Sequence, residues 1–421
     1  MQIQSPKGTR DILPSEVQTW QWVEQTARDV FGTYGYQEIR TPIFESTDLF
    51  VRGVGDTTDI VEKEMYTFSD RGNRSVSLRP EGTASVVRAM LQNRLMDGAS
   101  VLKFYYIGQM FRYDRPQAGR YREFWQVGIE AFGADSPAID AEIIAAGHQF
   151  FSTLGIKDLT LHLNSIGDPI CRPKYVEDLT AYAKQHLNEL CGKCYARHER
   201  NPMRILDCKE SGCRAVIANA PLLSDYLCGA CREHFDMVKS HLDELEIDYH
   251  EDPYVVRGLD YYCRTAFEFT AGGLGAQNAI GGGGRYDYLA EEIGGVATPG
   301  IGFALGMDRI IIALEAQDVT VPTAAPVDVY LTVLGDAAMP ITLKLAQELR
   351  ENGVKTDLEF KGRGLRAQMK TANKLNAQYV VMIGEDEINN AAATVRDMGS
   401  GDQQSVAFQQ LAEVMREKID S

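Results

Sequence analysis

Four arginines lie close together between residues 111 and 126, in a chain whose formal net charge is -16. The segment reads Phe-Arg-Tyr-Asp-Arg-Pro-Gln-Ala-Gly-Arg-Tyr-Arg-Glu-Phe-Trp-Gln, and β-rich sequence flanks it on both sides. This pattern predicts two antiparallel strands joined at Pro-Gln-Ala-Gly, with the arginines on the hairpin and its loop. Guanidinium groups bind phosphates through paired hydrogen bonds and stack on flat rings such as Phe124. Solvated strand charges are the alternative interpretation, but the clustering favours an anionic ligand.

Three further segments carry residues suited to the same ligand. Arg-Pro-Glu-Gly-Thr at 79–83 places Glu81 in a turn before a helix-like stretch, where a carboxylate could bind an ammonium group. Residues 257–268 begin with an arginine and continue with two tyrosines at the start of an alternating strand. A four-glycine strand at 279–287 is followed by a segment that ends at Arg309. Glycines let a backbone approach a ligand closely, and helix N-termini favour anions.

These motifs and their order resemble those of the histidyl-tRNA synthetases, a family of class II aminoacyl-tRNA synthetases, over essentially the whole chain. Lys-Gly-Thr-Arg-Asp-Ile-Leu-Pro, the following helix and Thr-Pro-Ile-Phe-Glu at 41–45 resemble class II motif 1, which forms the dimer contact in that family. The Phe-Arg hairpin resembles motif 2, and Gly-Ile-Gly-Phe-Ala-Leu-Gly-Met-Asp-Arg resembles motif 3. Arg-Gly-Leu-Asp-Tyr-Tyr resembles a signature of the histidine enzymes in particular. The resemblance implies a homodimer that activates L-histidine with ATP and transfers histidine to the 3′ end of tRNA(His).

The resemblance also implies roles around ATP. Arg112 and Arg257 are expected to be catalytic and to hold the α-phosphate, with Arg257 standing where other class II enzymes use a metal ion. Phe124 and Arg309 are expected to sandwich the adenine. Asp114 replaces the usual glutamate of motif 2 and is one methylene shorter, so the sequence leaves its contact to the adenine amino group open. Mg²⁺ is expected on the outer phosphates, and no protein ligand for a metal is predicted.

Selection of histidine requires an anion for the ammonium group and a polar lining for the imidazole. Glu130 lies four residues after Gln126 and therefore on the same face of a strand, which favours a pocket position over a surface one. Such a site binds other amino acids weakly when their side chains cannot form hydrogen bonds with its polar groups. The residues expected around histidine, by resemblance, are Glu81, Gly82, Thr83, Gln126, Glu130, Tyr261 and Tyr262.

Two places are predicted to contact tRNA. By resemblance, the hairpin loop reaches the acceptor end through Arg115, Gln117 and Arg120. Residues 361–374 contain five basic residues and no acidic one. Within that segment a stripe of basic side chains follows helical i, i+4, i+8 spacing: Arg366, Lys370 and Lys374. A solvated helix face would look the same, but the resemblance to an anticodon-binding module favours tRNA.

Composition and pattern predict several domains. A length of 421 residues exceeds one ordinary core, and a hydrophobic content of 44% can bury two or three. The expected fold is an α+β catalytic domain in two parts, residues 1–171 and 237–322, on a mixed, largely antiparallel six-stranded sheet of the class II type. A helical, cysteine-rich insertion is expected at 172–236. A proline-containing linker at 319–326 then leads to an α/β anticodon-binding domain at 327–421.

Individual elements follow from periodicity. A helix is expected at 16–33. In the C-terminal domain, strands are expected at 327–334, 355–360 and 379–383, and helices at 341–351 and 365–375.

Charge and hydropathy exclude other classes. The negative net charge argues against indiscriminate nucleic-acid binding. No apolar run of about twenty residues is present, and the N-terminus lacks the apolar core of a signal peptide. Neither secretion nor membrane insertion is expected, and a cytoplasmic protein is predicted.

Six of the eight cysteines fall in the 172–236 segment. They are Cys191, Cys194, Cys208, Cys213, Cys228 and Cys231. Two Cys-x-x-Cys pairs can bind tetrahedral zinc, but the gap between them exceeds the roughly 15 to 20 residues of common zinc ribbons, and the histidyl-tRNA synthetases do not require a metal here. Free thiols are therefore favoured and zinc is left open. Cys171 and Cys263 are expected to be packing residues.

Two other functions are compatible with parts of the pattern. A non-catalytic synthetase paralogue can serve as the regulatory subunit of ATP phosphoribosyltransferase in histidine biosynthesis. Such proteins generally lack the C-terminal domain and lose the catalytic arginines, whereas this chain keeps both. A class II synthetase for threonine, proline or glycine is the other possibility, and the Arg-Gly-Leu-Asp-Tyr-Tyr segment argues against it.

Overall fold

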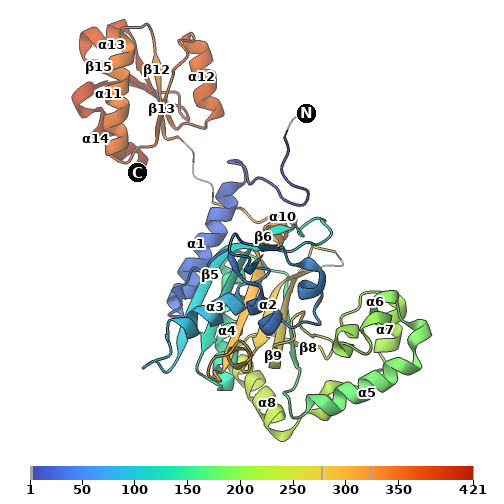
Figure 1. Cartoon of the computed structure of the whole chain (residues 1–421). Coiled ribbons are helices and arrows are strands. Elements are labelled where there is room, and N and C mark those ends of the chain that lie inside the picture. Colours follow the sequence, from blue (N-terminus) through green and yellow to red (C-terminus); the bar gives the residue numbers. More distant parts are fainter. Residues whose placement is uncertain (1–2, 276–277, 323–324, 326, 421) are drawn as a thin grey trace. The chain divides into compact units, whose positions relative to one another are not determined.

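The computed structural model describes residues 3–275, 278–322, 325 and 327–420. The chain divides into two compact units, Met1–Val321 and Pro322–Ser421 (Figure 1). Residues 323, 324 and 326 of the expected linker lie outside the described residues. Within the described part of the chain, no helix combines the length and the apolar character needed to cross a membrane.

An eight-stranded sheet forms the centre of the N-terminal unit. Its order is β1 (Gln37–Glu38), β5 (Leu102–Phe111), β6 (Glu123–Phe132), β11 (Gly300–Gly306), β10 (Ala279–Arg285), β9 (Cys263–Ala271), β7 (Leu159–Ser165), β8 (His250–Glu251). The expected number of six strands is therefore wrong. The six longer strands pair antiparallel, and the two-residue strands β1 and β8 add to the edges in parallel to β5 and β7. Two residues are too few to show a periodicity, so the sequence pattern could not reveal these strands.

One face of the sheet packs against helices α1 (Val17–Thr33), α4 (Pro137–Thr153) and α10 (Met307–Ala316). The helix expected at 16–33 is confirmed by α1, whose buried side chains recur at helical spacing along one face. Phe31 of α1 contacts Phe150 of α4 and Phe303 of β11, with ring centroids 5.5 Å and 5.9 Å apart. Strand β6 contributes Val127 and Ile129 to this core. Its alternate residues, including Gln126 and Glu130, therefore point to the opposite face.

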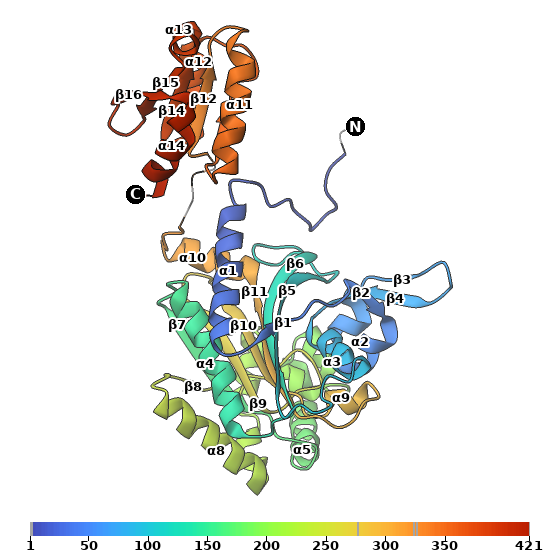
Figure 2. The ribbon, with the colours of Figure 1, turned by 90° about the vertical axis from the view of Figure 1, so that its left-hand side faces the viewer.

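The opposite face lies beneath helices α2 (Thr47–Val54) and α3 (Thr83–Gln92), as Figure 2 shows. A small antiparallel sheet of β2 (Phe44–Ser46), β4 (Ser75–Leu78) and β3 (Thr67–Ser69) adjoins them. Val86, Val87 and Met90 of α3 pack with Tyr106 and Met110 of β5. This face carries the candidate site.

The cysteine-rich segment lies between β7 and β8 and is helical. It consists mainly of α5 (Arg172–Gln185), α6 (Gly192–Arg197), α7 (Ser211–Ile217) and α8 (Gly229–Glu244). Helix α8 continues beyond residue 236, the boundary expected from the sequence, and packs along α4. Val238 and Leu242 of α8 belong to the main core. The last helix of the segment is thus an integral part of the N-terminal unit.

A fully buried arginine fixes the end of the glycine-rich strand β10. Arg285 forms ion pairs of 2.8 Å with both Asp140 and Asp287. Asp140 also accepts hydrogen bonds from Thr265 of β9 at 2.6 Å and from His234 of α8 at 2.8 Å. An unpaired buried guanidinium would cost several kcal/mol, so this network holds β9, β10, α4 and α8 in one arrangement.

The C-terminal unit is a five-stranded sheet with helices. The strand order is β13 (Thr356–Leu358), β12 (Val329–Val333), β14 (Tyr379–Ile383), β15 (Ala392–Asp397), β16 (Gln403–Ala407). Strand β12 is parallel to both of its neighbours, whereas β14, β15 and β16 are antiparallel. The helices are α11 (Ala338–Glu351), α12 (Leu365–Lys374), α13 (Glu385–Asn390) and α14 (Leu411–Asp420). The three strands and two helices expected here are confirmed, and the elements after β14 were not predicted.

Candidate active site

A pocket on the open face of the sheet gathers residues from the hairpin, the 257–268 segment, β10 and the start of α10. Its lining includes Arg112, Phe124, Gln126, Arg257 and Arg309. Residues that are far apart in the sequence thus meet at one place. Arg120 also lines this pocket, and four guanidinium groups around one pocket create a site for a polyanion that also carries a flat ring.

Arg112 is held at the base of the hairpin, immediately after the last pair of β5 and β6. Its Nε donates a 2.8 Å hydrogen bond to the carbonyl of Pro80, and its guanidinium lies 5.4 Å from the centroid of the Phe124 ring. Burial lowers the pKa of Arg112 from its ordinary value, although an arginine remains protonated in proteins. A partly buried, fixed cation of this kind favours binding of an anion.

Arg257 lies across the pocket and is oriented by a carboxylate. Its Nη1 forms a 3.0 Å ion pair with Glu268 of β9. Burial opposes the charge of Arg257, yet the neighbouring Tyr262 and Glu268 raise its pKa above the ordinary value. A Cβ atom at Gly282 would lie 2.7 Å from Nη1, so the glycine of β10 leaves the space that the guanidinium occupies.

Arg309 reaches back from α10 to the sheet and the hairpin loop. Its Nη1 donates to the carbonyl of Ala279 at 2.7 Å, and its Nε donates to the carbonyl of Gly119 at 3.4 Å. Gly119 has φ +68, and a Cβ there would lie 3.2 Å from Cγ of Arg309. The loop can therefore close over Arg309 because this turn position lacks a side chain.

Glu81 and Glu130 form the polar end of the site. The Glu81 carboxylate accepts the backbone N–H groups of Thr83 at 2.7 Å and Ala84 at 2.9 Å, and so caps α3. The Thr83 hydroxyl donates to Glu130 at 2.6 Å, and the Tyr286 hydroxyl donates to the other oxygen of Glu130. Burial raises the pKa of Glu130 to about 8, although both hydroxyl bonds act in the opposite direction.

Several buried polar atoms near this end have no hydrogen-bond partner among the described residues. They are Oε1 of Gln126 and the hydroxyl oxygens of Tyr106 and Tyr261. The Tyr261 ring lies 4.6 Å from that of Tyr262 and 5.6 Å from that of Tyr286. Buried polar groups in proteins are normally paired, so this cluster is suited to a polar ligand.

The structure separates the four hairpin arginines. Arg112 and Arg120 line the pocket, whereas the Arg122 guanidinium lies 3.7 Å from the centroid of the Tyr113 ring. Arg115 is exposed. The arginines expected to act together therefore have different surroundings.

Asp114 is held within the loop. Its carboxylate forms an ion pair with Arg120 and accepts the backbone N–H of Arg115 at 2.6 Å. Gln117 is exposed, and its backbone forms a bridge with that of Arg120. The loop thus has internal order of its own.

Sequence reasoning missed three contributors. Glu268 forms an ion pair with Arg257, and Tyr286 donates a hydrogen bond to Glu130. Both residues lie in motifs from which other residues were predicted to belong to the site. The third is the N-terminal segment, which was assigned only to dimer contact. There the Gly8 carbonyl accepts the backbone N–H of Arg122 at 2.8 Å, and Arg10 lies 3.6 Å from the Asp308 carboxylate.

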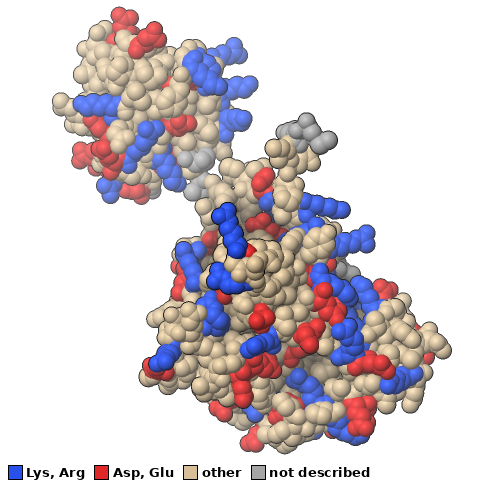
Figure 3. Space-filling model, in the orientation of Figure 1, with Lys and Arg blue, Asp and Glu red and all other residues tan. Residues whose placement is uncertain are grey.

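In the C-terminal unit, the basic stripe is exposed along α12. The side chains of Arg366, Lys370 and Lys374 are all exposed. Figure 3 shows basic side chains projecting from this unit over α12. The nearby Arg363 is different, because it forms a 2.6 Å ion pair with Glu359.

The antiparallel sheet with its arginine-lined pocket, together with a separate α/β unit, defines an aminoacyl-tRNA synthetase of class II. Comparison with known proteins specifies which one. A family model described as histidyl-tRNA synthetase matches residues 8–310, and a model of an anticodon binding domain matches residues 328–418. The chain belongs to the histidyl-tRNA synthetase family.

Individual relatives extend over the full length. The chain is 53% identical over 406 residues to the histidine--tRNA ligase of Desulforamulus reducens, covering 96% of this chain and 97% of that protein. It is 50% identical over 419 residues to the histidine--tRNA ligase of Halothermothrix orenii, covering 100% of both. The crystal structure of apo S. aureus histidyl-tRNA synthetase matches with a TM-score of 0.84 and 37% identity, covering 99% of this chain and 100% of that one.

Proposed function

We propose that the protein is a histidine–tRNA ligase, which activates L-histidine with ATP and transfers it to tRNA(His). One observation carries this proposal. In a chain about half identical to histidine–tRNA ligases over its full length, the three arginines expected to bind ATP line one pocket. The regulatory paralogue is less supported, because the chain retains those arginines and matches the anticodon binding domain.

In the first step a histidine carboxylate oxygen attacks the α-phosphorus of ATP. The bond to the bridging oxygen breaks, and pyrophosphate leaves with its electron pair. Two anions must be brought together, so positioning and charge stabilisation dominate the barrier. Arg112 and Arg257 are the catalytic residues of the proposal, and both bind the α-phosphate. A well-placed donor of this kind contributes about 2.7 to 4 kcal/mol to transition-state stabilisation.

Phe124 and Arg309 hold the adenine between a ring and a guanidinium. Asp114 lines the same pocket, and its contact to the adenine amino group would compete with its ion pair to Arg120.

Mg²⁺ enters with the nucleotide. The carboxylates that line the pocket, Asp114, Glu268 and Asp308, each lie beside an arginine. Because each carboxylate is next to a positive charge, these side chains do not provide a binding site for Mg²⁺. We therefore assign Mg²⁺ to the outer phosphates of ATP. No protein ligand is assigned to it.

Histidine occupies the polar end of the pocket. Glu81, with Gly82 and Thr83 beside it, binds the ammonium group. Glu130 faces the imidazole. Gln126, Tyr261 and Tyr262 complete the pocket, and the unpaired polar atoms of Gln126 and Tyr261 support this assignment.

In the second step the 3′ hydroxyl of tRNA attacks the carbonyl carbon of the adenylate, and AMP leaves. The loop residues Arg115, Gln117 and Arg120 contact the acceptor end. The stripe of Arg366, Lys370 and Lys374 contacts the anticodon arm. The proposal also includes a homodimer formed through the motif 1 region, a cytoplasmic location, and an insertion domain at 172–236.

The test is amino-acid-dependent exchange of labelled pyrophosphate into ATP, measured separately with each of the common amino acids. Histidine alone should support exchange. A protein that exchanges with threonine, proline or glycine would be a different class II synthetase. A pure, folded protein that binds histidine without exchange would instead favour the regulatory paralogue.

A further inference from the structure

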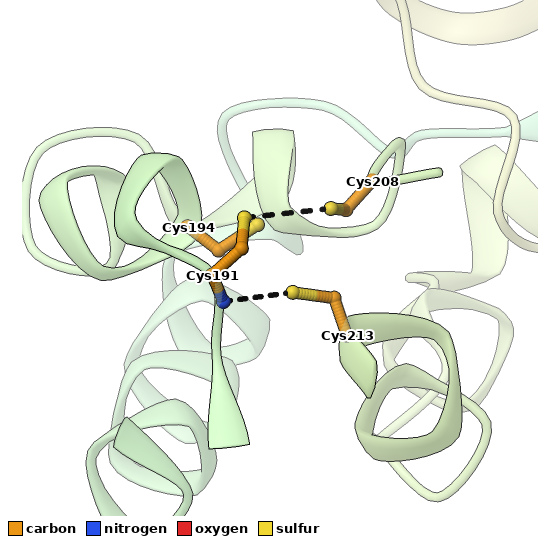
Figure 4. A group of neighbouring side chains, drawn as sticks. All are labelled: Cys191, Cys194, Cys208 and Cys213. Carbon is orange, nitrogen blue, oxygen red and sulfur yellow. Dashed lines mark hydrogen bonds between the residues drawn. The ribbon is translucent and has the colours of Figure 1, made fainter. Parts of the chain in front are cut away.

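Four thiols meet in the cysteine-rich segment. The Sγ atoms of Cys191, Cys194, Cys208 and Cys213 all lie within 4.8 Å of one another. Figure 4 shows the four side chains turned toward a common centre from separate stretches of chain. Cys191 precedes α6, Cys194 lies in α6, Cys208 directly follows a turn, and Cys213 lies in α7.

We propose that these four cysteines bind one structural zinc ion. A tetrahedral ion with Zn–S bonds of about 2.3 Å places its sulfur ligands about 3.8 Å apart. The Sγ atoms of Cys191 and Cys208 are 3.8 Å apart. The backbone N–H of Cys191 also donates to Sγ of Cys213 at 3.1 Å.

The donor set selects the kind of metal. Four sulfur ligands without oxygen suit zinc or iron rather than magnesium or calcium. Cys194 and Cys213 are buried, so one side of the cluster is shielded from solvent. The atoms of an iron–sulfur cluster would require a wider cage than these thiols form. Because four protein ligands complete a tetrahedron, the site has a structural role.

The helices around the four cysteines are short, and a bound metal ion would stabilise their arrangement. Helix α6 has six residues, α7 has seven, and the 3₁₀ helix Pro202–Ile205 has four. Isolated helices shorter than about 12 residues are marginal in water. A metal that joins both short α-helices and the turn at Cys208 would fix their arrangement.

The structure also corrects the pairing suggested by the sequence. The two Cys-x-x-Cys pairs do not face each other. Cys228 and Cys231 instead lie with Asp168 and Cys171, so Cys171 is more than an isolated packing residue. In this second cluster, Oδ1 of Asp168 already accepts the backbone N–H groups of Ile170 and Cys171. The second cluster provides a matched control for the first.

The proposed zinc site supports a segment that contacts the 257–262 loop. Arg197 pairs with Asp59, and Asn201 donates a 2.8 Å hydrogen bond to Asp260. A Cβ at Gly258 would lie 3.1 Å from Nη1 of Arg204. Gly258 follows Arg257 directly in the chain. The zinc ion would thus act as a positioning element, outside the pocket, for the loop that carries Arg257.

The experiment measures metal in the full chain, purified without chelator, by inductively coupled plasma mass spectrometry. The intact protein should contain zinc, and Cys208→Ser should lose one zinc per chain. The control variant Cys231→Ser should retain this zinc ion. The absence of zinc from the intact protein would overturn the proposal, as would iron in its place. Loss from Cys231→Ser with retention in Cys208→Ser would place the ion in the other cluster and overturn it as well.

Two measurements on the unmodified chain remain decisive if Cys208→Ser fails to fold. Cobalt-substituted protein should show the visible spectrum of a tetrahedral four-thiolate site, and a spectrum from fewer thiolates would contradict the proposal. Thiol titration after denaturation in chelator should find all eight cysteines reduced. Two missing thiols and no zinc would mean a disulfide in place of the metal and would overturn the proposal.

Discussion

Replacing Glu130 by glutamine should change how stability depends on pH. Glu130 is fully buried, and its carboxyl group accepts the hydroxyls of Thr83 and Tyr286. A glutamine has nearly the same shape and can bond to both hydroxyls, but it cannot ionise. The variant therefore resembles the protonated form of Glu130 at every pH.

The direction and size of the effect follow from the raised pKa. Burial raises the pKa of Glu130 to about 8, from 4.5 for an ordinary glutamate. Below pH 4.5 both the folded and the unfolded chain hold the proton. Between 4.5 and 8 only the folded chain holds it, so the free energy of unfolding falls by about 1.4 kcal/mol per pH unit. The full difference is about 5 kcal/mol, and about 3 kcal/mol of it falls between pH 5.5 and 7.5.

Tryptophan fluorescence can follow this effect in the N-terminal unit alone, because Trp20, Trp22 and Trp125, the three tryptophans of the chain, all lie there. The thermal midpoint of Glu130→Gln, relative to the unmodified protein, should rise between pH 5.5 and 7.5. With roughly 2 °C per kcal/mol for a large domain, the change is about 6 °C. The KM for histidine should rise in the variant, because glutamine, unlike Glu130, cannot ionise when the imidazole binds.

The matched control is Glu291→Gln, which alters an exposed glutamate of the same unit. Its midpoint should follow that of the unmodified protein across the pH range. If the curve for Glu130→Gln runs parallel to the unmodified curve from pH 5.5 to 7.5, then Glu130 does not hold its proton in the fold. The account of burial given above would then be wrong.

Four other substitutions or measurements test the proposed function and assembly. Arg257→Ala should lower the turnover of pyrophosphate exchange by a hundredfold or more, at the scale of about 3 kcal/mol for one lost donor, and near-normal turnover would remove Arg257 from the mechanism. Neutralising Arg366, Lys370 and Lys374 together should weaken tRNA charging and flatten its salt dependence while exchange is unchanged; equal loss of both activities would contradict an anticodon contact. Neutralising Arg115 and Arg120 should instead impair transfer to the acceptor end. Light scattering at micromolar concentration should show a two-fold dimer, and a monomer alone would refute it.

Motifs with strong local signals were located well from the sequence. The hairpin was recognised because alternating apolar residues flank a turn of Pro, Ala and Gly, and the structure pairs β5 with β6 from Leu102–Phe132 to Phe111–Glu123. The position of Gln126 and Glu130 on one face of their strand was also predictable, since side chains of a strand alternate between its two faces. Strand β14 runs from Tyr379 to Ile383, the bounds that its buried apolar run predicted.

Features that depend on contacts between distant parts of the chain could not be predicted from the sequence. Strands β1 and β8 exist only because neighbouring strands offer them an edge. The cysteines were grouped by spacing into two Cys-x-x-Cys pairs, yet the fold places each pair with different partners. Nothing local in the sequence distinguishes Cys208 from Cys171 as a neighbour of either pair. Loop conformation sets that choice, and spacing rules do not describe it.

The glycines illustrate the same limit at the centre of the site. Their presence in β10 and β11 suggested close approach of the backbone to a ligand. The structure shows a second reason, because a Cβ at Gly302 would lie 1.8 Å from Oε2 of Glu130 and one at Gly128 would lie 2.3 Å from the Tyr106 ring. Gly302 lies directly opposite Glu130 in the register of β11 with β6. These glycines therefore leave room for large polar side chains of the chain itself to lie against the sheet at the polar end of the pocket.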